Sequence, residues 1–548
     1  MQTASPLKLA LVSIHIQKSS RAVPLGAAMI ASSLKSALHD LVKPVLINLY
    51  LDQSVDESVN EILKTDPDCA GFSVYLWNRR QTLLIAGALK KKKPGIVIFA
   101  GGSEPTADMA DIKKEGSGNI DFVLAGEGEN ISVDAVRKIY SGSIPKDEKA
   151  LLPVNLDELP SPYLDSTLDV KLYSGLLWEL SRGCPFKCDF CFESRGYDKV
   201  RMFPIHRIQE ELMFFASARV SEIFVLDPTF NHNKKRAKDL LVMMHNIAPD
   251  IHFNIEIRSE YLDREMAALF SSIKCSLQIG MQSANKDVLE NINRTINKMD
   301  FEKKILFLHE ADVTYGFDLI YGLPGDTISG FLQSLDFALG MMPNHIDIFP
   351  LAVLPGTRLF ETASALGLEY QNKDPYLVLS SPLFPVSDMR QAEEIAAAFD
   401  LFYNKGKAVP WLPLLLENLN ILPSQFFPRL ASWIKDNRLE VIQEYSGPKN
   451  FTEIISLQRD FITYIFTEEN KGSLTRIMLD IVQFFGLCSQ INEDEKEEAS
   501  AWFNYSPSEL IENLDKGVRD LAELPFFVPV CNAETRISYR DGQIIISQ

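Results

Sequence analysis

Short β-rich runs alternate with helical stretches through residues 8–142 and again from about residue 175, and this alternation restricts the fold more than any other feature. The first series contains LALVSIHI, VLINLY, GFSVYL, IVIFAGG and DFVLAGEGE. Nearly continuous apolar strands separated by helices indicate a parallel sheet that is covered on both faces. Residues 1–142 are therefore predicted to form a doubly wound α/β domain, which binds ligands at the carboxyl ends of its strands.

Small, polar and acidic residues follow the third, fourth and fifth of these runs. Glycine at such a position lets the backbone approach a bulky ligand closely. The candidate binding residues of this edge are Ser73, Trp77, Asn78, Gly101, Gly102, Ser103, Glu104, Gly126, Glu127 and Gly128.

Residues 143–170 are rich in proline and charge and are predicted to be a linker. The second series of runs follows, in the order LLWELSRGC, EIFVLDPTF, HFNIEIRSE, CSLQIGMQS, TYGFDLIYGLP and HIDIFPLAV. Six βα units predict a partial (β/α)6 TIM-type barrel over residues 171–372, with its chemistry on the loops after the strands. Residues 373–548 are predicted to form a mostly helical domain.

Three cysteines lie within eight residues in SRGCPFKCDFCFES, namely Cys184, Cys188 and Cys191, and Phe190 precedes the last of them. Thiolates bind soft metals, and a short loop can wrap a metal cluster. A structural zinc site normally has four protein ligands, and the nearest histidine is His206. An iron–sulfur cube held by three thiolates leaves one iron open, which is a catalytic feature. The spacing favours such a cluster over zinc or unliganded core thiols.

The pattern C-x3-C-x-aromatic-C after the first barrel strand resembles the signature of the radical S-adenosylmethionine superfamily. The resemblance implies that the open iron of a [4Fe-4S] cluster binds S-adenosylmethionine. It also implies that one electron, from a donor such as flavodoxin or ferredoxin, cleaves this cofactor to methionine and a 5′-deoxyadenosyl radical.

The later barrel motifs resemble those of oxygen-independent coproporphyrinogen oxidases and their relatives. Where relatives have a Gly-rich stretch for the methionine amino group, this chain has LDPTF, so Asp227 or Thr229 would replace that contact. The resemblance implies that S-adenosylmethionine is held by Phe190, Asp227, Thr229, Glu256, Gln282, Ser283, Arg294 and Asp318.

The strand ends FSVYLWN, AGGSEPT and LAGEGE resemble those of the cobalamin-binding domain in cobalamin-dependent radical S-adenosylmethionine proteins. This resemblance implies that the candidate edge residues contact cobalamin, with Ser73 beside its nucleotide tail. The family's Asp-x-His-x-x-Gly motif is absent, and His15 and His39 are expected to be structural. We therefore expect no histidine of that motif to ligate the cobalt. A domain that has kept the fold and lost the cofactor stays an alternative.

The leading interpretation is a cobalamin-dependent radical enzyme that methylates an unactivated carbon of a small molecule or peptide. A radical enzyme without methyl transfer is the second interpretation. A tRNA methylthiotransferase is disfavoured, because the first domain lacks a further cysteine triad and the net charge of −18 suits RNA poorly. The complete set of cysteines and cofactor residues argues against a binding protein without enzymatic activity.

The remaining composition bears on location and partners. The charge of −18 disfavours nucleic acid and anionic membranes, and the basic run Lys90 to Lys93 is predicted to be a solvated face. The sequence has no apolar run of transmembrane length, and seven cysteines do not suit a disulfide framework. We therefore expect a cytoplasmic protein. Cys69 and Cys275 are expected in the core, and Cys488 and Cys531 as isolated buried thiols.

Overall fold

The computed structural model describes residues 5–116, 118–195, 199–437, 451–493, 497–540 and 543–547. The chain divides into two compact units. The first consists of Met1–Ile279, Ile292–Val313 and Leu351–Leu379, and the second of Gly280–Asn291, Thr314–Pro350 and Ser380–Gln548.

The first unit begins with a six-stranded parallel sheet in the order β2-β1-β3-β4-β5-β6. Its strands are β1 Leu7–His15, β2 Val42–Tyr50, β3 Cys69–Ser73, β4 Val97–Gly101, β5 Phe122–Ala125 and β6 Glu148–Lys149. The doubly wound sheet predicted from the sequence is confirmed. One difference is that β6 lies in the predicted linker, where it pairs with β5.

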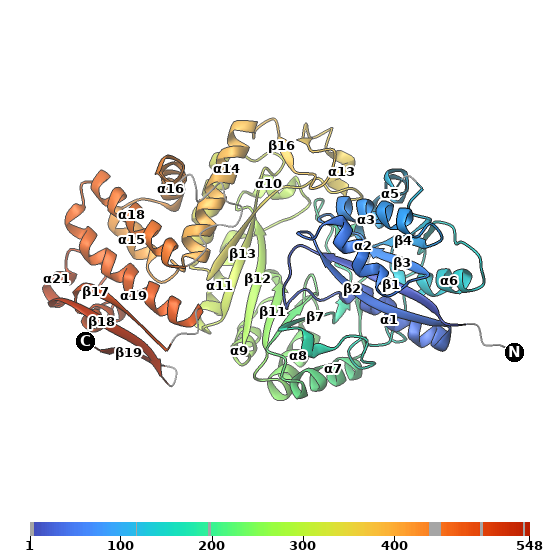
Figure 1. Ribbon diagram of the computed structural model, residues 1–548. Helices are drawn as coiled ribbons and strands as arrows, with labels where there is room; N and C mark the ends of the chain where they lie inside the picture. The colour runs from blue at the N-terminus through green and yellow to red at the C-terminus, as the bar shows by residue number, and fades with distance from the viewer. Residues whose placement is uncertain are drawn as a thin grey trace. The chain divides into compact units, whose positions relative to one another are not determined.

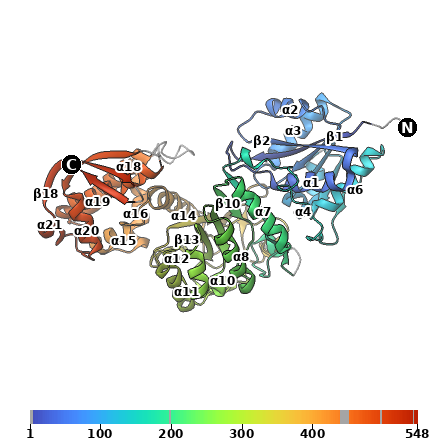
Figure 2. The same cartoon turned by 90° about the horizontal axis from the view of Figure 1, so that it is seen from below.

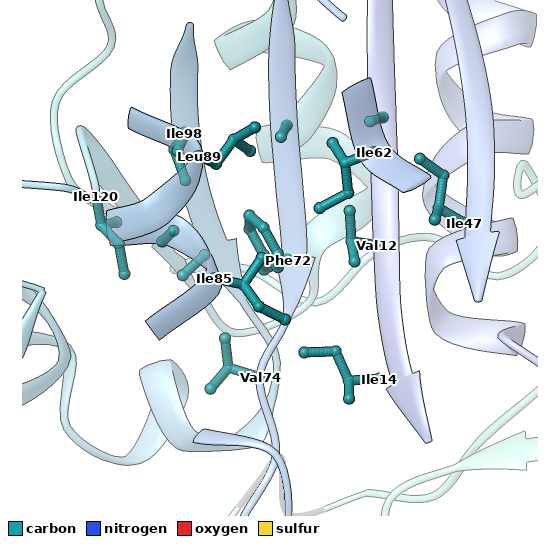
Figure 3. Packing of buried hydrophobic residues seen from close by; sticks show 14 of the residues in the cluster. Val12, Ile14, Ile47, Ile62, Phe72, Val74, Ile85, Leu89, Ile98 and Ile120 are labelled. Carbon is teal, nitrogen blue, oxygen red and sulfur yellow. The ribbon is translucent and has the colours of Figure 1, made fainter. Parts of the chain in front are cut away.

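Helices cover both faces of this sheet (Figures 1 and 2). On one face lie α2 (Val55–Leu63) and α3 (Arg79–Lys92), and on the other lie α1 (Leu25–Leu38) and α6 (Gly128–Tyr140). Successive side chains of a strand point to opposite faces, so Val12 and Ile14 of β1 pack under α2 and α3 (Figure 3). Burial of each such side chain stabilises the fold by about 1.5–3 kcal/mol.

The six predicted barrel strands are all present, in one sheet of order β14-β13-β12-β11-β10-β7. They are β7 Gly175–Trp178, β10 Glu222–Val225, β11 His252–Ile257, β12 Cys275–Gln282, β13 Thr314–Tyr321 and β14 His345–Pro350. The connecting helices include α7 Ile205–Ser217, α8 Lys234–Ile247, α9 Arg264–Ser271, α11 Lys298–Glu310 and α12 Ile328–Leu339. The strands β14 and β7 lie at the two ends of this sheet and are not neighbours in it, so the barrel is open, as a partial barrel requires. Two short strands, β8 (Ser181–Arg182) and β9 (Arg201–Met202), pair antiparallel beside the cysteines.

The second unit ends in the mostly helical region that the sequence predicts. Its helices are α14 Val386–Phe399, α15 Leu412–Leu419, α16 Pro423–Asn437, α18 Phe451–Glu468, α19 Thr475–Glu493, α20 Pro507–Asp515 and α21 Leu524–Phe527. An antiparallel sheet in the same region was not predicted, and it consists of β17 Glu498–Tyr505, β18 Val530–Arg540 and β19 Gln543–Ser547. Phe484 and Leu487 of α19 pack with Phe503 and Ile537 of this sheet.

Within the described residues, one helical stretch, Gly472–Ile491, is long and apolar enough to cross a membrane. Half of its apolar window is buried inside the structure, and core helices of soluble proteins pass the same test. The buried residues of this stretch, such as Ile477, Ile481 and Phe484, serve the core of the second unit.

Candidate active site

The three clustered cysteines lie in the loop after β8 of the first unit. Cys184 and Cys188 are 8% and 6% exposed, and Cys191 is half-buried. The loop is held at its centre, because the Asp189 amide donates to the Ile292 carbonyl at 3.0 Å and Asn293 Nδ2 donates to the Lys187 carbonyl at 2.7 Å. Residues more than 100 positions apart thus fix the loop's course. Phe190 is half-buried between the second and third cysteines.

Asp227 fixes the strand that leads into this loop. Its Oδ1 accepts from the Leu180 and Ser181 amides at 2.8 and 2.9 Å, and its Oδ2 accepts from Ser181 Oγ at 2.6 Å. Burial raises the pKa of Asp227 to about 6, although the three hydrogen bonds lower it in part. Its carboxylate is thus engaged in positioning β8. The other predicted residue of this motif, Thr229, places its Oγ1 4.0 Å from Cys184 Sγ.

Two guanidinium groups flank Cys188. Arg258 lies 3.8 Å above the Phe186 ring and pairs with Glu260 at 2.6 Å, and both Arg258 and Arg294 interact with the Cys188 side chain. Burial opposes the charged form of Arg258, but Glu260 outweighs it and raises the Arg258 pKa. Burial and then the charge of Arg258 lower the pKa of Arg294.

This donor set fits an iron–sulfur cluster. Three thiolates carry negative charge into a mostly buried loop, and the two arginines offset it. In the described part of the chain, no three His, Cys, Asp or Glu side chains converge on a single ion. An iron–sulfur cube does not need three side chains to converge on a single ion, since each thiolate binds a different iron. Sequence reasoning missed Arg258, although it lies two residues after Glu256 in the motif IEIRSE.

Glu256 lies on β11 opposite Gln278 of β12. Its neighbours Ile255 and Ile257 are buried, so the alternation of the strand turns Glu256 to the less covered face. Gln282 ends β12 with φ 68°, a left-handed conformation that is uncommon outside glycine. Its Oε1 is buried without a hydrogen-bond partner, which suits an acceptor kept for a ligand.

Ser283 and Asp318, like Gln282, belong to the second unit. Ser283 Oγ accepts from the Asn285 amide at 3.0 Å and lies 3.3 Å from Ser334 Oγ, so this hydroxyl serves the turn before α10 (Lys286–Glu290). Asp318 stands on β13 opposite Asp347 of β14.

At the edge of the N-terminal sheet, Ser73 and Gly101 are register partners at the carboxyl ends of β3 and β4. Both are half-buried, and a side chain added at Gly101 would meet its nearest atom, the Leu124 carbonyl oxygen, at an ordinary 3.5 Å. This small-residue surface fits a large ring and its tail. Gly102 differs, because at φ 117° its Cβ would lie 2.5 Å from the Val74 carbonyl oxygen. The fold itself therefore requires glycine at residue 102.

Trp77 and Asn78 follow β3 and differ in accessibility. Trp77 is 46% exposed, stacks on Tyr75 with 4.7 Å between ring centroids, and donates to the Ile14 carbonyl at 3.1 Å. Asn78 is fully buried, and its amide bonds to the backbone of Tyr75, Ile14 and Ser73. Trp77 thus presents a flat apolar surface at the sheet edge, whereas Asn78 holds the loop.

Glu104 has protein partners. Glu104 is the second residue of the short helix α4 (Ser103–Ala107). Its Oε2 accepts hydrogen bonds from Arg79 at 2.9 Å and from the Tyr376 hydroxyl at 3.2 Å. Arg79 is itself buried and also pairs with Glu115. This network attaches residues 351–379, which include Tyr376, to the N-terminal sheet.

Glu127 is likewise engaged. It pairs with Arg201 of β9, and its Oε2 accepts from the Val154 amide at 2.7 Å. The two glycines around it have structural roles, since Gly126 adopts φ 89° and a Cβ on Gly128 would meet Ile30 at 2.9 Å.

Ion pairs join this sheet edge to the cysteine loop. Arg182, two residues before Cys184, pairs with Glu129 of α6 at 2.6 Å and with Glu179 at 2.8 Å. Arg182 is largely buried, and the pKa of its guanidinium is raised by Glu129 and Glu179 against the cost of burial. The structure thus places the start of α6, which follows β5, next to β8, and so brings the edge of the N-terminal sheet beside the cysteine loop.

His15 lies at the carboxyl end of β1, and its Nε2 is 3.1 Å from Asn48 Oδ1. Burial lowers its pKa, and the contact with Asn48 opposes that shift. Asn48 in turn contacts the Tyr173 hydroxyl at 3.4 Å. The ring is thus engaged with its neighbours on the sheet, which agrees with the structural role that we expect.

Two family models match the chain. Residues 18–136 match the B12 binding domain, and residues 178–338 match the radical SAM superfamily. The first range covers the doubly wound sheet and the second covers the cysteine loop and most of the barrel strands.

Individual proteins match over much of the chain. The cobalamin-dependent radical SAM methyltransferase TokK of Streptomyces tokunonensis is 25% identical over 59% of this chain and 52% of its own length. The 2-(S-pantetheinyl)-carbapenam-3-carboxylate methyltransferase of Streptantibioticus cattleyicolor is 25% identical over 64% of this chain and 55% of its own length. The chain thus spans about half the length of these two relatives.

A solved structure agrees with the fold. The cobalamin-dependent S-adenosylmethionine radical enzyme OxsB, solved with aqua-cobalamin and S-adenosylmethionine bound, superposes with a TM-score of 0.59 at 15% identity. The match covers 95% of this chain and 84% of OxsB. The chain thus carries a B12 binding domain, matched over residues 18–136, followed by a radical SAM domain, matched over residues 178–338, and the three-cysteine loop lies in the second of these domains.

Proposed function

We propose that this protein is a cobalamin-dependent radical S-adenosylmethionine enzyme that methylates an unactivated carbon of a small molecule or peptide. The observation that carries the proposal is the pairing of Arg182 with Glu129, because it joins the B12-type sheet edge to the loop of Cys184. A reaction that uses both cofactors requires the two sites to be adjacent. The names of the two methyltransferase relatives support the reaction type.

The cluster would be held by Cys184, Cys188 and Cys191. When bound, the cluster and S-adenosylmethionine supply a 5′-deoxyadenosyl radical, and cobalamin supplies the methyl group. Arg258 and Arg294 offset the negative charge of the thiolates beside Cys188.

Other residues would orient the cofactors. Glu256 and Asp318 are acceptors for ribose hydroxyls, and the unpaired Oε1 of Gln282 is a further acceptor. Ser73, Gly101 and Trp77 would border cobalamin. We assign Asp227, Asn78, Glu104 and Glu127 to positioning instead, since their polar atoms already bond to the protein.

Domain limits and location complete the proposal. We propose domains at residues 1–142, 171–372 and 373–548, with residues 143–170 between the first two. A cytoplasmic location suits the three free thiols of the cysteine loop, because free thiols persist in reducing compartments. The partners would be the substrate and a one-electron donor, without nucleic acid or membrane.

Methyl transfer is tested with S-adenosylmethionine that carries a deuterated methyl group. Anaerobically reconstituted protein, loaded with cobalamin and given candidate metabolites and peptides, should move the deuterated methyl to one substrate and release 5′-deoxyadenosine. Mass spectrometry follows both products. Formation of 5′-deoxyadenosine with a changed but unlabelled substrate would refute methyl transfer and support a radical enzyme of another kind.

Arg294→Ala should weaken S-adenosylmethionine binding. The family resemblance assigns the Arg294 guanidinium to this cofactor. Loss of a charge-assisted contact between the guanidinium and the cofactor costs about 1.5–3 kcal/mol, or roughly ten- to a hundredfold in affinity. Equilibrium dialysis of the reconstituted protein measures the affinity. The matched control is Arg264→Ala, which removes an exposed arginine paired with Glu310 at 2.7 Å and should leave binding unchanged. Equal affinities for the two variants would place the contact elsewhere.

A further inference from the structure

A cavity of about 690 Å³ lies in the first unit beside the cysteine loop, and the proposed function does not use it. Its walls come from the loop itself, from the strand β9 region and from the start of α8. The lining residues are Pro185, Lys199, Val200, Met202, His232, Asn233, Lys234 and Lys235.

Three of these residues are exposed lysines. Within the described part of the chain, Lys199 and Lys235 form no ion pair, and Lys234 reaches Asp263 only at 3.8 Å. Positive charge therefore remains at this cavity, in a protein whose net charge is −18.

The basic run Lys90 to Lys93, the most obvious one in the sequence, differs in that most of its charges are paired. Lys90 pairs with Asp121 at 2.7 Å, Lys92 with Asp56 at 3.0 Å and Lys93 with Asp66 at 2.8 Å. Three of its four charges are thus matched by carboxylates of the same domain.

The wall of the cavity is close to the cysteines. Pro185 follows Cys184 directly, and adjacent Cα atoms are about 3.8 Å apart. The His232 amide donates to the Thr229 carbonyl at 3.2 Å, and Thr229 Oγ1 lies 4.0 Å from Cys184 Sγ. The cavity wall therefore contains the residue next to the first cysteine and a residue bonded to Thr229, whose hydroxyl lies near that cysteine. His232 Nδ1 is buried in this wall without a protein partner.

We propose that this basic cavity, lined by Lys199, Lys234 and Lys235, docks an acidic one-electron carrier protein, and the inference rests on the proposed function. One electron leaves the carrier, which is oxidised by one electron, and enters the cluster that the three thiolates would hold. Electron-transfer encounters use small interfaces, and complementary charge raises their association rate. A positive surface next to the cluster loop suits that encounter, because the rest of the protein repels an acidic partner.

The test compares two sources of electrons in Lys199→Glu/Lys234→Glu/Lys235→Glu. Binding of flavodoxin to the full chain, measured by biolayer interferometry at low salt, should weaken at least about tenfold, since electrostatic steering changes association by 10–10³. Formation of 5′-deoxyadenosine with reduced flavodoxin should fall in parallel. Formation with dithionite, which needs no docking surface, should stay at the wild-type rate.

The matched control moves the same number of charges elsewhere. It is Lys43→Glu/Lys91→Glu/Lys149→Glu, whose lysines are exposed on β2, α3 and β6. This variant should bind flavodoxin as tightly as wild type. Changing the cavity lysines to glutamine removes the charges without reversing them and should weaken flavodoxin binding by a smaller factor. This variant keeps the test valid if the charge-reversed variant does not fold.

Two outcomes would overturn the proposal: unchanged flavodoxin affinity in the cavity variants, or equal losses in the control. Failure of the proposed function looks different, because wild-type protein would then either make no 5′-deoxyadenosine with dithionite or make it without moving a labelled methyl group. Binding to flavodoxin is measured without turnover, so it decides the docking surface by itself.

Discussion

Changing Cys184, Cys188 and Cys191 together to alanine is expected to reduce bound iron from about four atoms per chain to none after anaerobic reconstitution. The three thiolates are the cluster ligands that this loop offers, and alanine has no ligand atom. Formation of 5′-deoxyadenosine should disappear with the iron. Iron and sulfide analysis, together with the absorbance spectrum, measures the loss.

The control for this experiment uses the cysteines outside the loop. Cys488 and Cys531 are half-buried at the packing of α19 on the C-terminal sheet. Cys488→Ala/Cys531→Ala should keep the full iron content. A triple variant that retains its iron, or a wild-type protein that takes up only zinc, would refute the cluster assignment.

Gly101→Leu is expected to abolish retention of cobalamin. Gly101 is half-buried at the carboxyl edge beside Ser73, where added atoms would occupy the space assigned to the corrin ring and its nucleotide tail. Retention is measured as the cobalamin absorbance that remains after anaerobic reconstitution and desalting. The barrel should stay folded, so the iron content of the same sample should not change.

Gly101→Ala is the matched control, because its Cβ meets only an ordinary contact with Leu124, and it should retain cobalamin. Gly102→Leu would be a poorer test, since its side chain would collide with the Val74 backbone whether or not cobalamin binds. His15→Ala should leave the cobalt spectrum unaltered. Wild-type protein that keeps no cobalamin after desalting would make the domain a cap without cofactor and would remove methyl transfer with it.

Much of the fold was predictable because it follows from local patterns. Val12 and Ile14 alternate with Leu11 along β1, and this period of two indicates a strand buried on both faces. The same reasoning located all six barrel strands. The C-terminal sheet escaped it, because β17 has mixed burial and only Phe503 on that strand is deeply buried. A strand with one weakly apolar face gives little periodic signal.

Individual polar residues were harder to assign than motifs. Glu104 and Glu127 follow their strands at the predicted edge, but Arg79 and Arg201 pair with them. Asp227 stands where a cofactor contact is expected, but it accepts three hydrogen bonds from Leu180 and Ser181. A buried carboxylate is costly without partners, and those partners lie 25 to 74 positions away in the chain.

The sequence by itself determined the three-thiol loop and the order of strands, since covalent spacing and residue periodicity are local properties. Tertiary structure alone decided which charges are matched. Lys90, Lys92 and Lys93 stand together in the sequence and are paired with carboxylates, whereas Lys199 and Lys235 lie 36 positions apart and meet at one cavity. The physical reason is that electrostatic energy depends on distance in space and on burial, and the folded chain fixes both by bringing together residues from distant segments.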